Sequence, residues 1–260
     1  MRDSFFQIDV SPLVWRVFKR HLIVFSRNWK VNITFNFIEP FLYLIALGIG
    51  LGAYVQPIEG LPYLKYLAPG LVVSSAMFAA SYECTYGTFV RMEFQKTFQA
   101  MVTTPISIDD VIAGEIIYGA FKSTLYGIIF LLVTLVLGLV ASPWVFLMPF
   151  LLALAGLFFA IISIIWTGLV PRIESFNYFF TLIMTPVFLF SGIFFPLSGL
   201  PQFIQKIAWF NPLFHVTNLS RGLILGPLGQ GLWLDLLWLL VFTILLFPLP
   251  IYLMRRLVIK

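Results

Sequence analysis

Residues 186–221 read PVFLFSGIFFPLSGLPQFIQKIAWFNPLFHVTNLSR, and this stretch decides how the last third of the chain can fold. Proline lacks an amide hydrogen and keeps the residue before it out of the helical region. One continuous helix is therefore excluded by Pro186, Pro196, Pro201, Pro212 and Pro227. An ordinary loop between two spans is one interpretation. However, the many aromatic and aliphatic side chains would be unfavourable in a solvated loop, and broken backbone at membrane depth must be satisfied by protein or a wet cavity. We therefore predict a re-entrant or interfacial helical hairpin over about residues 196–227.

The composition places the chain among polytopic membrane proteins. Hydrophobic residues make up 60% of the 260 residues and charged residues only 10%, whereas a soluble domain has about 25% charged residues. Apolar runs of about 20 residues recur, which is the length needed to cross a hydrocarbon core of roughly 30 Å. The N-terminus lacks the pattern of a removable signal peptide, so we expect the first span to direct insertion. The single cysteine, Cys84, predicts neither an internal disulfide nor a metal cluster.

Six apolar segments are long enough to be spans, and an amphipathic segment precedes them. Ser11-Pro12 is a helix-start signal, and the helix it begins carries two tryptophans on an apolar stripe beside basic residues. This pattern favours an interfacial helix on anionic headgroups over a solvated helix. We therefore expect an all-α polytopic membrane protein, with a cytoplasmic tail and amphipathic helix in residues 1–30 and a six-span domain in residues 31–260. The expected spans are 31–55, 64–89, 111–139, 144–170, 176–195 and 232–254, with the re-entrant hairpin between spans five and six.

Basic residues are distributed unequally over the two sides of such a chain. If the N-terminus is inside, twelve of the sixteen lysines and arginines lie on the inner side and Lys122 lies within a span. Only Lys65, Lys206 and Arg221 lie on the outer side. The positive-inside rule then places both termini in the cytoplasm and the broken stretch outside.

Residues 91–110 form the longest polar connector, on the predicted cytoplasmic side. Apolar and charged residues alternate there, which predicts a short amphipathic helix over about residues 91–104. Ser107, followed three residues later by Asp110, resembles a capping box and predicts the start of span three. A helix of mixed character suits a groove in a partner protein, where a few anchors carry most of the binding energy. The anchors that we expect are Arg91, Glu93, Phe94 and Phe98.

Several ionisable residues lie within the apolar segments, where charge is costly. Glu83 is either a functional residue that faces the bundle interior or a residue solvated near the headgroups. Glu115 and Lys122 share a helical face, but they lie about 10 Å apart along it and cannot pair directly. His215 has no second histidine or carboxylate at ligand spacing, so we expect a hydrogen-bonded residue rather than a metal ligand.

A series of short motifs gives the chain a resemblance to a known family. In order, they are APGLVVSSAM at 68–77, ECTYGTFVRM at 83–92, TTPIS at 103–107 with AGEI at 113–116, MTPVFLFSGIFFPLSGLP at 184–201 and NPLFHVTNLSRGLILG at 211–226. No single motif is diagnostic, but their order and spacing resemble the type 2 ATP-binding cassette exporter permeases. The most similar branch is that of the nodulation-factor exporters, the NodJ-like permeases.

The resemblance implies a half-transporter of the bacterial inner membrane that pairs with a second copy of itself and with two copies of a separate cytoplasmic ATPase. It also implies that the amphipathic N-terminal helix is a connecting helix and that residues 91–104 are a coupling helix. The export route would lie between spans two and five of the two copies. The expected route residues are Met77, Ser81, Tyr82, Glu83, Tyr86, Met184, Phe188 and Phe194, and the expected outer gate residues are Ser191, Gly192, Phe195 and Pro196.

The chain lacks motifs for chemistry of its own. It has no GxxxxGK[ST] phosphate loop, no HExxH and no GxSxG, so we expect no catalytic, cofactor or metal site and no nucleic-acid partner, with ATP and Mg²⁺ bound by the ATPase. The soft, aromatic route favours export of an amphipathic cargo among membrane lipid, such as a glycolipid or lipo-oligosaccharide. Multidrug or antibiotic efflux is the alternative within the family. Outside it, the alternatives are an intramembrane enzyme that uses Glu83, His215 or Asp235 and a passive channel.

Overall fold

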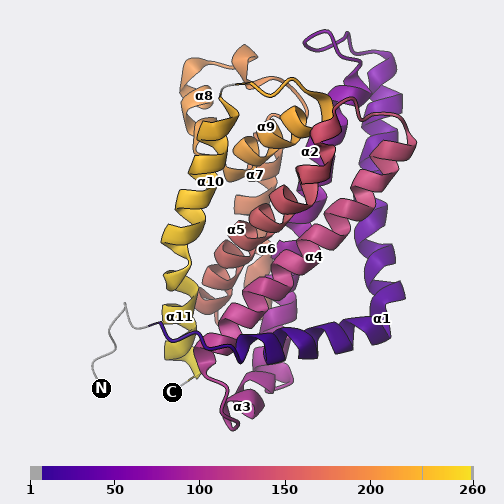
Figure 1. The fold of residues 1–260 in the computed structure, drawn as a ribbon. Helices are drawn as coiled ribbons and strands as arrows, with labels where there is room; N and C mark the ends of the chain where they lie inside the picture. Colours follow the sequence, from indigo (N-terminus) through magenta and orange to yellow (C-terminus); the bar gives the residue numbers. More distant parts are fainter. Residues whose placement is uncertain (1–7, 230, 259–260) are drawn as a thin grey trace.

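The computed structural model describes residues 8–229 and 231–258, where the regular structure is helical apart from an isolated bridge between Ile58 and Leu61. Long helices stand side by side, and short helices lie at both ends of the bundle (Figure 1). The predicted tail in residues 1–7 lies outside the described residues. The helices are α1 (Val14–Tyr43), α2 (Tyr63–Tyr82), α3 (Thr97–Val102), α4 (Ile108–Val136), α5 (Met148–Leu169), α6 (Phe176–Phe179), α7 (Thr185–Leu189), α8 (Gln202–Trp209), α9 (Pro212–Leu225), α10 (Leu232–Leu246) and α11 (Pro248–Val258).

Four helical stretches of the described chain are long and apolar enough to cross a membrane. They are Tyr63–Phe94, Ile108–Val136, Pro143–Leu169 and Leu232–Leu257, and they correspond to predicted spans two, three, four and six. The prediction of an all-α polytopic membrane protein is therefore confirmed. Where spans one and five were predicted, the apolar helices are shorter, Leu44–Ala53 and Ile173–Leu189, so the count of six spans stays a prediction.

The predicted amphipathic helix is joined to span one without a break. The amphipathic helix and the first part of predicted span one belong to α1, whose beginning lies across one end of the bundle before the helix turns upright (Figure 1). The rest of span one follows as η1 (Leu44–Gly50) and η2 (Leu51–Ala53). The apolar stripe of the lying part is divided between two surroundings. Phe18 and Phe25 pack edge-on against Phe121 of α4, with ring centroids 5.8 and 6.1 Å apart. Trp15 and Trp29 are exposed. Part of the stripe expected to face lipid is thus used to attach α1 to α4.

Polar contacts fasten the end of the bundle where the start of α1, α3 and the end of α11 meet (Figure 1). The predicted capping box is confirmed: the Ser107 side chain accepts from the Asp110 amide, and the Asp110 carboxylate accepts in return. Asp110 Oδ1 also accepts from the Ser11 amide at 2.6 Å. The neighbouring Asp109 Oδ1 accepts from Arg255 Nε at 2.5 Å. The start of α4 is therefore the point to which both ends of the described chain are tied.

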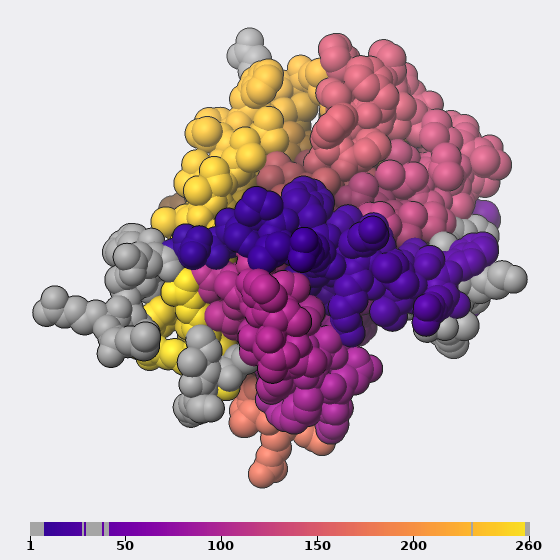
Figure 2. Space-filling model, turned by 60° about the horizontal axis from the view of Figure 1, so that its bottom comes forward, coloured from indigo at the N-terminus to yellow at the C-terminus, as the bar shows by residue number. Residues whose placement is uncertain are grey.

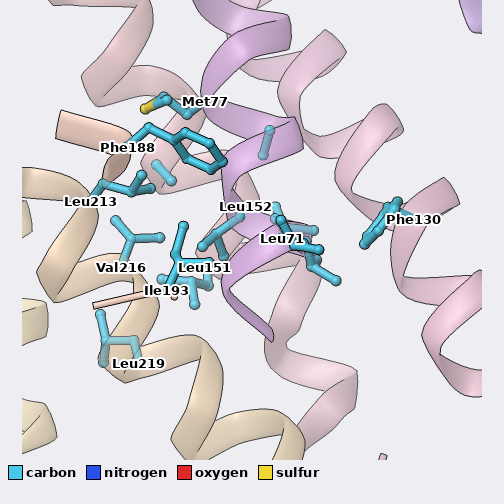
Figure 3. Close-up of a cluster of buried hydrophobic side chains, with 14 of the residues drawn as sticks. Leu71, Met77, Phe130, Leu151, Leu152, Phe188, Ile193, Leu213, Val216 and Leu219 are labelled. Carbon is cyan, nitrogen blue, oxygen red and sulfur yellow. The ribbon is translucent and has the colours of Figure 1, made fainter. Parts of the chain in front are cut away.

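The core is built around α2, which packs on α1, α4, α5 and α9. In its most apolar stretch 83% of residues are buried, against 22% in the α10–α11 stretch, so α2 is central and α10–α11 peripheral. Figure 3 shows apolar side chains from α2, α4, α5 and α9 converging around Leu71. Close approach depends on small residues: a Cβ atom on Gly70 would lie 2.6 Å from Ile193 Cγ1.

The connector is two pieces rather than the single helix predicted over residues 91–104. The first piece, the π-helical turn η4 (Val90–Phe94), continues span two, and α3 forms the second. Between them Lys96 has a φ of 52°, in the left-handed region that ends a helix. Met92 and Phe98 are buried, so the turn lets both pieces place an apolar side on the bundle.

The proline-rich stretch is broken as predicted. The helix of span five ends with α7 at Leu189, and the separate helices α8 and α9 follow. The Asn211 side chain caps α9 by accepting from the Leu213 amide at 2.9 Å. Both helices lie at the end of the bundle opposite α3 (Figure 1). Their insertion into the membrane stays a prediction.

Candidate functional site

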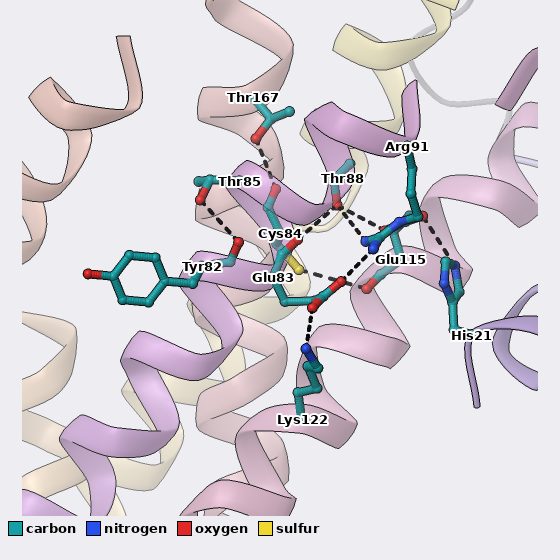
Figure 4. Close-up of polar contacts among 10 residues, drawn as sticks. All are labelled: His21, Tyr82, Glu83, Cys84, Thr85, Thr88, Arg91, Glu115, Lys122 and Thr167. Carbon is teal, nitrogen blue, oxygen red and sulfur yellow. Dashed lines mark hydrogen bonds and ion pairs between the residues drawn. The ribbon is translucent and has the colours of Figure 1, made fainter. Parts of the chain in front are cut away.

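Four charged side chains form a buried network between span two and α4 (Figure 4). Arg91 lies at its centre. Its Nη1 donates to Glu83 Oε1 at 2.6 Å, and its Nη2 and Nε donate to the two Glu115 oxygens at 2.5 and 3.0 Å. Lys122 Nζ donates to Glu83 Oε2 at 2.6 Å. None of the four side chains is more than 14% exposed, and Glu115 is fully buried. Two positive and two negative charges thus form a neutral, desolvated cluster.

The winding of span two beyond Tyr82 places the first two members of the network. Two π-helical turns follow there, η3 (Glu83–Gly87) and η4, and such turns occur frequently at functional sites. Gly87 lies between Glu83 and Arg91. A Cβ atom at Gly87 would approach Glu83 Oε1 to 2.7 Å and Arg91 Nη1 to 3.2 Å. A glycine is therefore what lets the two side chains reach each other along the helix.

α1 reaches the same network through His21. The His21 Nε2 atom lies 3.2 Å from Glu115 Oε1, and its ring stacks on Tyr118 at 4.7 Å and 17°. Thr88 Oγ1 donates to Glu115 Oε2 at 2.9 Å. Glu115 therefore holds together the lying part of α1, span two and α4. A displacement of any one of these elements must either move the others or expose a buried charge.

The geometry supports a mechanical role for the network rather than a chemical one. Removing one partner of a buried ion pair leaves an uncompensated charge and typically costs about 3–5 kcal/mol. The network stands directly beside the connector, because Arg91 belongs to η4. The chemical alternative used Glu83, His215 or Asp235 for acid–base work and required such groups to converge on a substrate. Instead, Glu83 is held by two cations, whereas His215 Nδ1 and Asp235 Oδ1 lie 2.6 Å apart and form a separate pair.

The network resolves what the sequence left open about its members. Glu83 faces the bundle interior, which was one of the two interpretations. Glu115 and Lys122 form no direct pair among the described contacts, as predicted, but Arg91 and Glu83 connect them. Sequence reasoning missed that Arg91 points inward. The signal was available, since two carboxylates and one lysine inside spans require a further cation.

The four residues expected to contact an ATPase divide into two groups. Arg91 lies inside the network, and the Phe98 side chain is fully buried. Phe94 is 67% exposed and Glu93 is also exposed. Both line a cavity of about 690 Å³ whose other wall is the turn at residues 171–175, with Tyr178. Figure 2 shows the surrounding face, where α1 crosses beside the connector.

The residues predicted to line the export route differ in how far they are buried. Met77, Ser81, Met184 and Phe188 are buried within the chain, and Ser81 Oγ lies 3.6 Å from Met184 Sδ. Phe194 is half-buried and packs edge-on against Phe188 with ring centroids 5.0 Å apart. Glu83 points into the charge network instead. The chain's own core thus uses most of these side chains, whereas Tyr82 is exposed and Tyr86, like Phe194, is half-buried.

Tyr82, Tyr86 and Phe180 form an aromatic ladder, the name we use for these three rings. Tyr82 and Phe180 stack with centroids 4.3 Å apart at 16°, and Tyr86 and Phe180 with centroids 5.8 Å apart at 11°. Tyr82 is 41% exposed. The Tyr86 hydroxyl donates to Asn177 Oδ1 at 3.2 Å. The ladder joins span two to η7 (Phe180–Met184) of predicted span five.

The predicted gate residues lie just beyond the end of α7. Ser191 and Gly192 are buried, Pro196 is half-buried, and Phe195 is 37% exposed. Gly192 has a φ of 76°, which favours glycine. The predicted gate residues thus lie in a bent segment packed on the bundle.

His215 is hydrogen-bonded on both ring nitrogens, as its assignment to a structural contact predicted. Nδ1 lies 2.6 Å from Asp235 Oδ1, and Nε2 lies 2.7 Å from the Trp209 carbonyl oxygen. Trp238 stacks on the ring at 4.5 Å. Together these contacts link α8, α9 and α10. Across the described residues, no group of three or more His, Cys, Asp or Glu side chains could hold a metal ion.

Comparison with known proteins identifies the family. The ABC-2 type transporter family matches residues 12–225. The chain is 34% identical over 250 residues to nodulation protein J of Sinorhizobium fredii, covering 96% of this chain and 95% of the relative. It is 36% identical over 215 residues to nodulation protein J of Rhizobium meliloti, covering 82% and 80%. It is 24% identical over 203 residues to the inner membrane transport permease YadH of Escherichia coli, covering 78% of each. The chain therefore belongs to the ABC-2 type transporter family, as a multi-pass membrane permease similar to nodulation protein J.

Proposed function

We propose that this permease exports a lipid-linked saccharide across the inner membrane, driven by ATP hydrolysis in a separate ATPase. The aromatic ladder is the observation that carries the proposal. It presents stacked rings on a partly exposed face, and two of the three rings carry a hydroxyl group. Such a surface suits a molecule with both apolar and hydroxylated parts. The resemblance of the sequence motifs to the nodulation-factor exporters implies the same class of cargo, and the similarity to nodulation protein J agrees with that resemblance.

Transport in this proposal takes place between two copies of the chain. The ladder lies on spans two and five, and the neighbouring Leu182, Leu189 and Phe190 are also exposed. A twofold pair would bring two such faces together, and twofold symmetry is the commonest arrangement of homo-oligomers. Phe180 and the tyrosines of both copies would then line one route.

Two copies of the ATPase would bind at the end that carries α3. Phe94 and Glu93 beside the cavity at residues 171–175 offer an apolar anchor with a charged rim. The network behind them would carry motion of the connector into α1, span two and α4. With this end cytoplasmic, reporter fusions after Lys260 and within residues 95–104 should read cytoplasmic, and a fusion at Gly199 should read external.

The test compares cargo in purified permease with its ATPase in lipid vesicles. A lipid-linked oligosaccharide should stimulate ATP hydrolysis and be transported, and its delipidated form should do neither. Tyr82→Ala with Phe180→Ala should reduce stimulation about tenfold or more, since stacked aromatic contacts are each worth up to about 1.5 kcal/mol beyond burial. Phe150→Ala, at an exposed aromatic on α5, is the matched control and should leave stimulation unchanged.

The other outcomes of this test are equally informative. Equal stimulation by the delipidated sugar would remove the lipid requirement. Stimulation by hydrophobic drugs alone would assign the permease to drug efflux, because the same ladder would stack on flat drug molecules.

A further inference from the structure

The break after α7 leaves backbone carbonyl oxygens without the amide donors of a continuing helix. Side chains donate to three carbonyl oxygens at and after this break. Val187 O accepts from Asn211 Nδ2 at 2.8 Å, and Phe188 O accepts from Ser191 Oγ at 2.7 Å. Gly192 O accepts from two donors on different helices, as described next. In a membrane such satisfaction by protein is required for broken backbone to persist.

The two donors to Gly192 O are Arg221 of α9 and Tyr66 of α2. Arg221 Nη2 donates at 2.6 Å and the Tyr66 hydroxyl donates at 3.1 Å. The guanidinium carbon of Arg221 also lies 3.9 Å from the centroid of the Tyr66 ring, in cation–π contact. One carbonyl oxygen thus joins α2, α9 and the segment that follows α7.

Arg221 is half-buried, and its environment is unusual for a cation. Among the residues that the structure describes, no carboxylate lies within ion-pair distance of it. Its Nε atom is buried and has no hydrogen-bond partner. Arg91 at the other end of span two, by contrast, has two carboxylates. The contacts of Arg221 are therefore with a carbonyl and a ring, which can be given up without separating an ion pair.

The segment that Arg221 holds is seated on α2. Ile193 packs against Gly70, where a Cβ atom would be only 2.6 Å from Ile193 Cγ1. Leu197 is buried and lies close to Gly192. Breaking the hydrogen bonds to the Gly192 carbonyl would leave this segment held on α2 by apolar packing alone. The cap of α9 at Asn211 would stay in place.

We propose that Arg221 is the positioning residue of the outer gate. With Tyr66 it holds the Gly192 carbonyl and keeps residues 191–197 seated on α2, and release of that carbonyl opens the gate. That this opening serves export rests on the proposed function. The contact between Arg221 and the Gly192 carbonyl is tested without cargo or ATP.

The test measures how fast a buried cysteine is labelled. Leu197→Cys is introduced with Cys84→Ala, and the full chain in lipid nanodiscs is treated with a bulky maleimide. Arg221→Gln should raise the labelling rate at least about tenfold, the value of a lost hydrogen bond to a charged donor. Arg221→Lys retains the cation over Tyr66 and one donor, so its rate should stay within about threefold of the parent. Tyr66→Phe, which removes one donor, should give an intermediate rate.

Two controls separate gate opening from general loosening. Arg256→Gln removes another guanidinium that lies over a ring, 4.4 Å from the centroid of Tyr252 at the opposite end, and should leave the rate unchanged. Native Cys84, buried deep in the bundle, should stay unlabelled in the Arg221→Gln chain that retains it. An unchanged labelling rate of the introduced cysteine in Arg221→Gln would overturn the proposal. Faster labelling of both the introduced cysteine and, in its own chain, Cys84 would indicate general loosening and would also overturn it. If Arg221→Gln fails to fold, the labelling rates of Tyr66→Phe and Arg221→Lys decide. The proposal expects Tyr66→Phe to be labelled faster than Arg221→Lys. Labelling rates equal to that of the parent in both variants would reject it.

Discussion

Arg91 illustrates at the scale of a residue why the charge network needs a guanidinium. Its three nitrogens each donate to a different carboxylate oxygen, two on Glu115 and one on Glu83. Arginine presents its donors in a rigid planar fork, whereas the lysine ammonium is a compact point charge. Lysine could therefore not serve both carboxylates from this position. Lys122 completes the set by taking the remaining Glu83 oxygen.

Neutralising Glu83 alone should lower the free energy of unfolding more than neutralising Glu83 together with Lys122. Glu83→Gln leaves Lys122 buried without its carboxylate, at a cost of about 3–5 kcal/mol in the free energy of unfolding. Adding Lys122→Met removes the stranded cation and should recover part of that loss. The exposed pair Glu93 and Lys96 is the control, and its removal should cost less than about 1 kcal/mol. Thermal unfolding of the detergent-solubilised chains gives all values, and a double variant no better than Glu83→Gln would contradict the pairing.

Gly87→Ala should damage the network without touching a charge. The added Cβ atom would meet Glu83 Oε1 at 2.7 Å and push the ion pair apart. We expect a loss of about 1–3 kcal/mol, the usual range for overpacking. Gly199→Ala, where no heavy atom lies within 4 Å, should change stability by less than about 0.5 kcal/mol. Equal unfolding temperatures for the two variants would show that Gly87 has no such role.

The connector shows at the scale of an element how a turn divides two functions. Lys96 in the left-handed region separates η4, which continues span two, from α3. Phe94 stays on the surface, whereas Phe98 on α3 is fully buried. One aromatic side chain is thus available to a partner and the other fastens the connector to the bundle.

Phe94→Ala should therefore weaken ATPase binding, and Phe98→Ala should lower stability. Phe94→Ala should leave the unfolding temperature unchanged and weaken capture of the purified ATPase by about tenfold or more, as an anchor does. Phe98→Ala should cost about 3–5 kcal/mol of stability through the cavity it leaves. A pull-down and a thermal scan on the same samples distinguish the two. Wild-type capture by folded Phe94→Ala would place the ATPase contact elsewhere.

For the whole molecule, exposed apolar side chains have two possible neighbours, lipid and a second copy. The α10–α11 stretch is apolar and mostly exposed, as a helix facing lipid would be. The face with the aromatic ladder adds hydroxyl groups to its apolar surface. The chain's single cysteine, Cys84, is fully buried in the core and offers no cross-linking position. The twofold contact must therefore be probed from exposed positions.

Cysteines on the ladder face should trap dimers, and cysteines on the lipid face should not. In a Cys84→Ala chain, Leu182→Cys and Phe190→Cys occupy exposed positions on the ladder side, and Ile244→Cys occupies an exposed position on α10. Oxidation in native membranes should give a dimer band from the first two and none from the third. Cross-linking from Ile244→Cys alone would move the twofold contact to α10.

Length, composition and local motifs predicted much of this fold. Little of the site could be predicted, because it depends on side-chain pairs that lie far apart in the sequence. Ser107 and Asp110 lie within one turn, so their capping box could be predicted from the sequence. The boundaries of spans two, three, four and six followed from apolar length. His215 and Asp235 are separated by 20 residues and two helix ends, so no local pattern signals their contact. Arg91 was assigned outward because its neighbours are polar, whereas its direction depends on the π-helical turns of span two, which the sequence did not indicate.

The neutrality of the charge network has a consequence for energised membranes. A single charge crossing a potential of about 100 mV gains or loses about 2.3 kcal/mol. Glu83, Arg91, Glu115 and Lys122 together carry no net charge, and hydrogen bonds connect all four. If they are displaced together, they form an electrically neutral unit. Displacing that unit within the bilayer does no electrical work against the potential. The conformational step that moves it should therefore run at the same rate in polarised and depolarised cells.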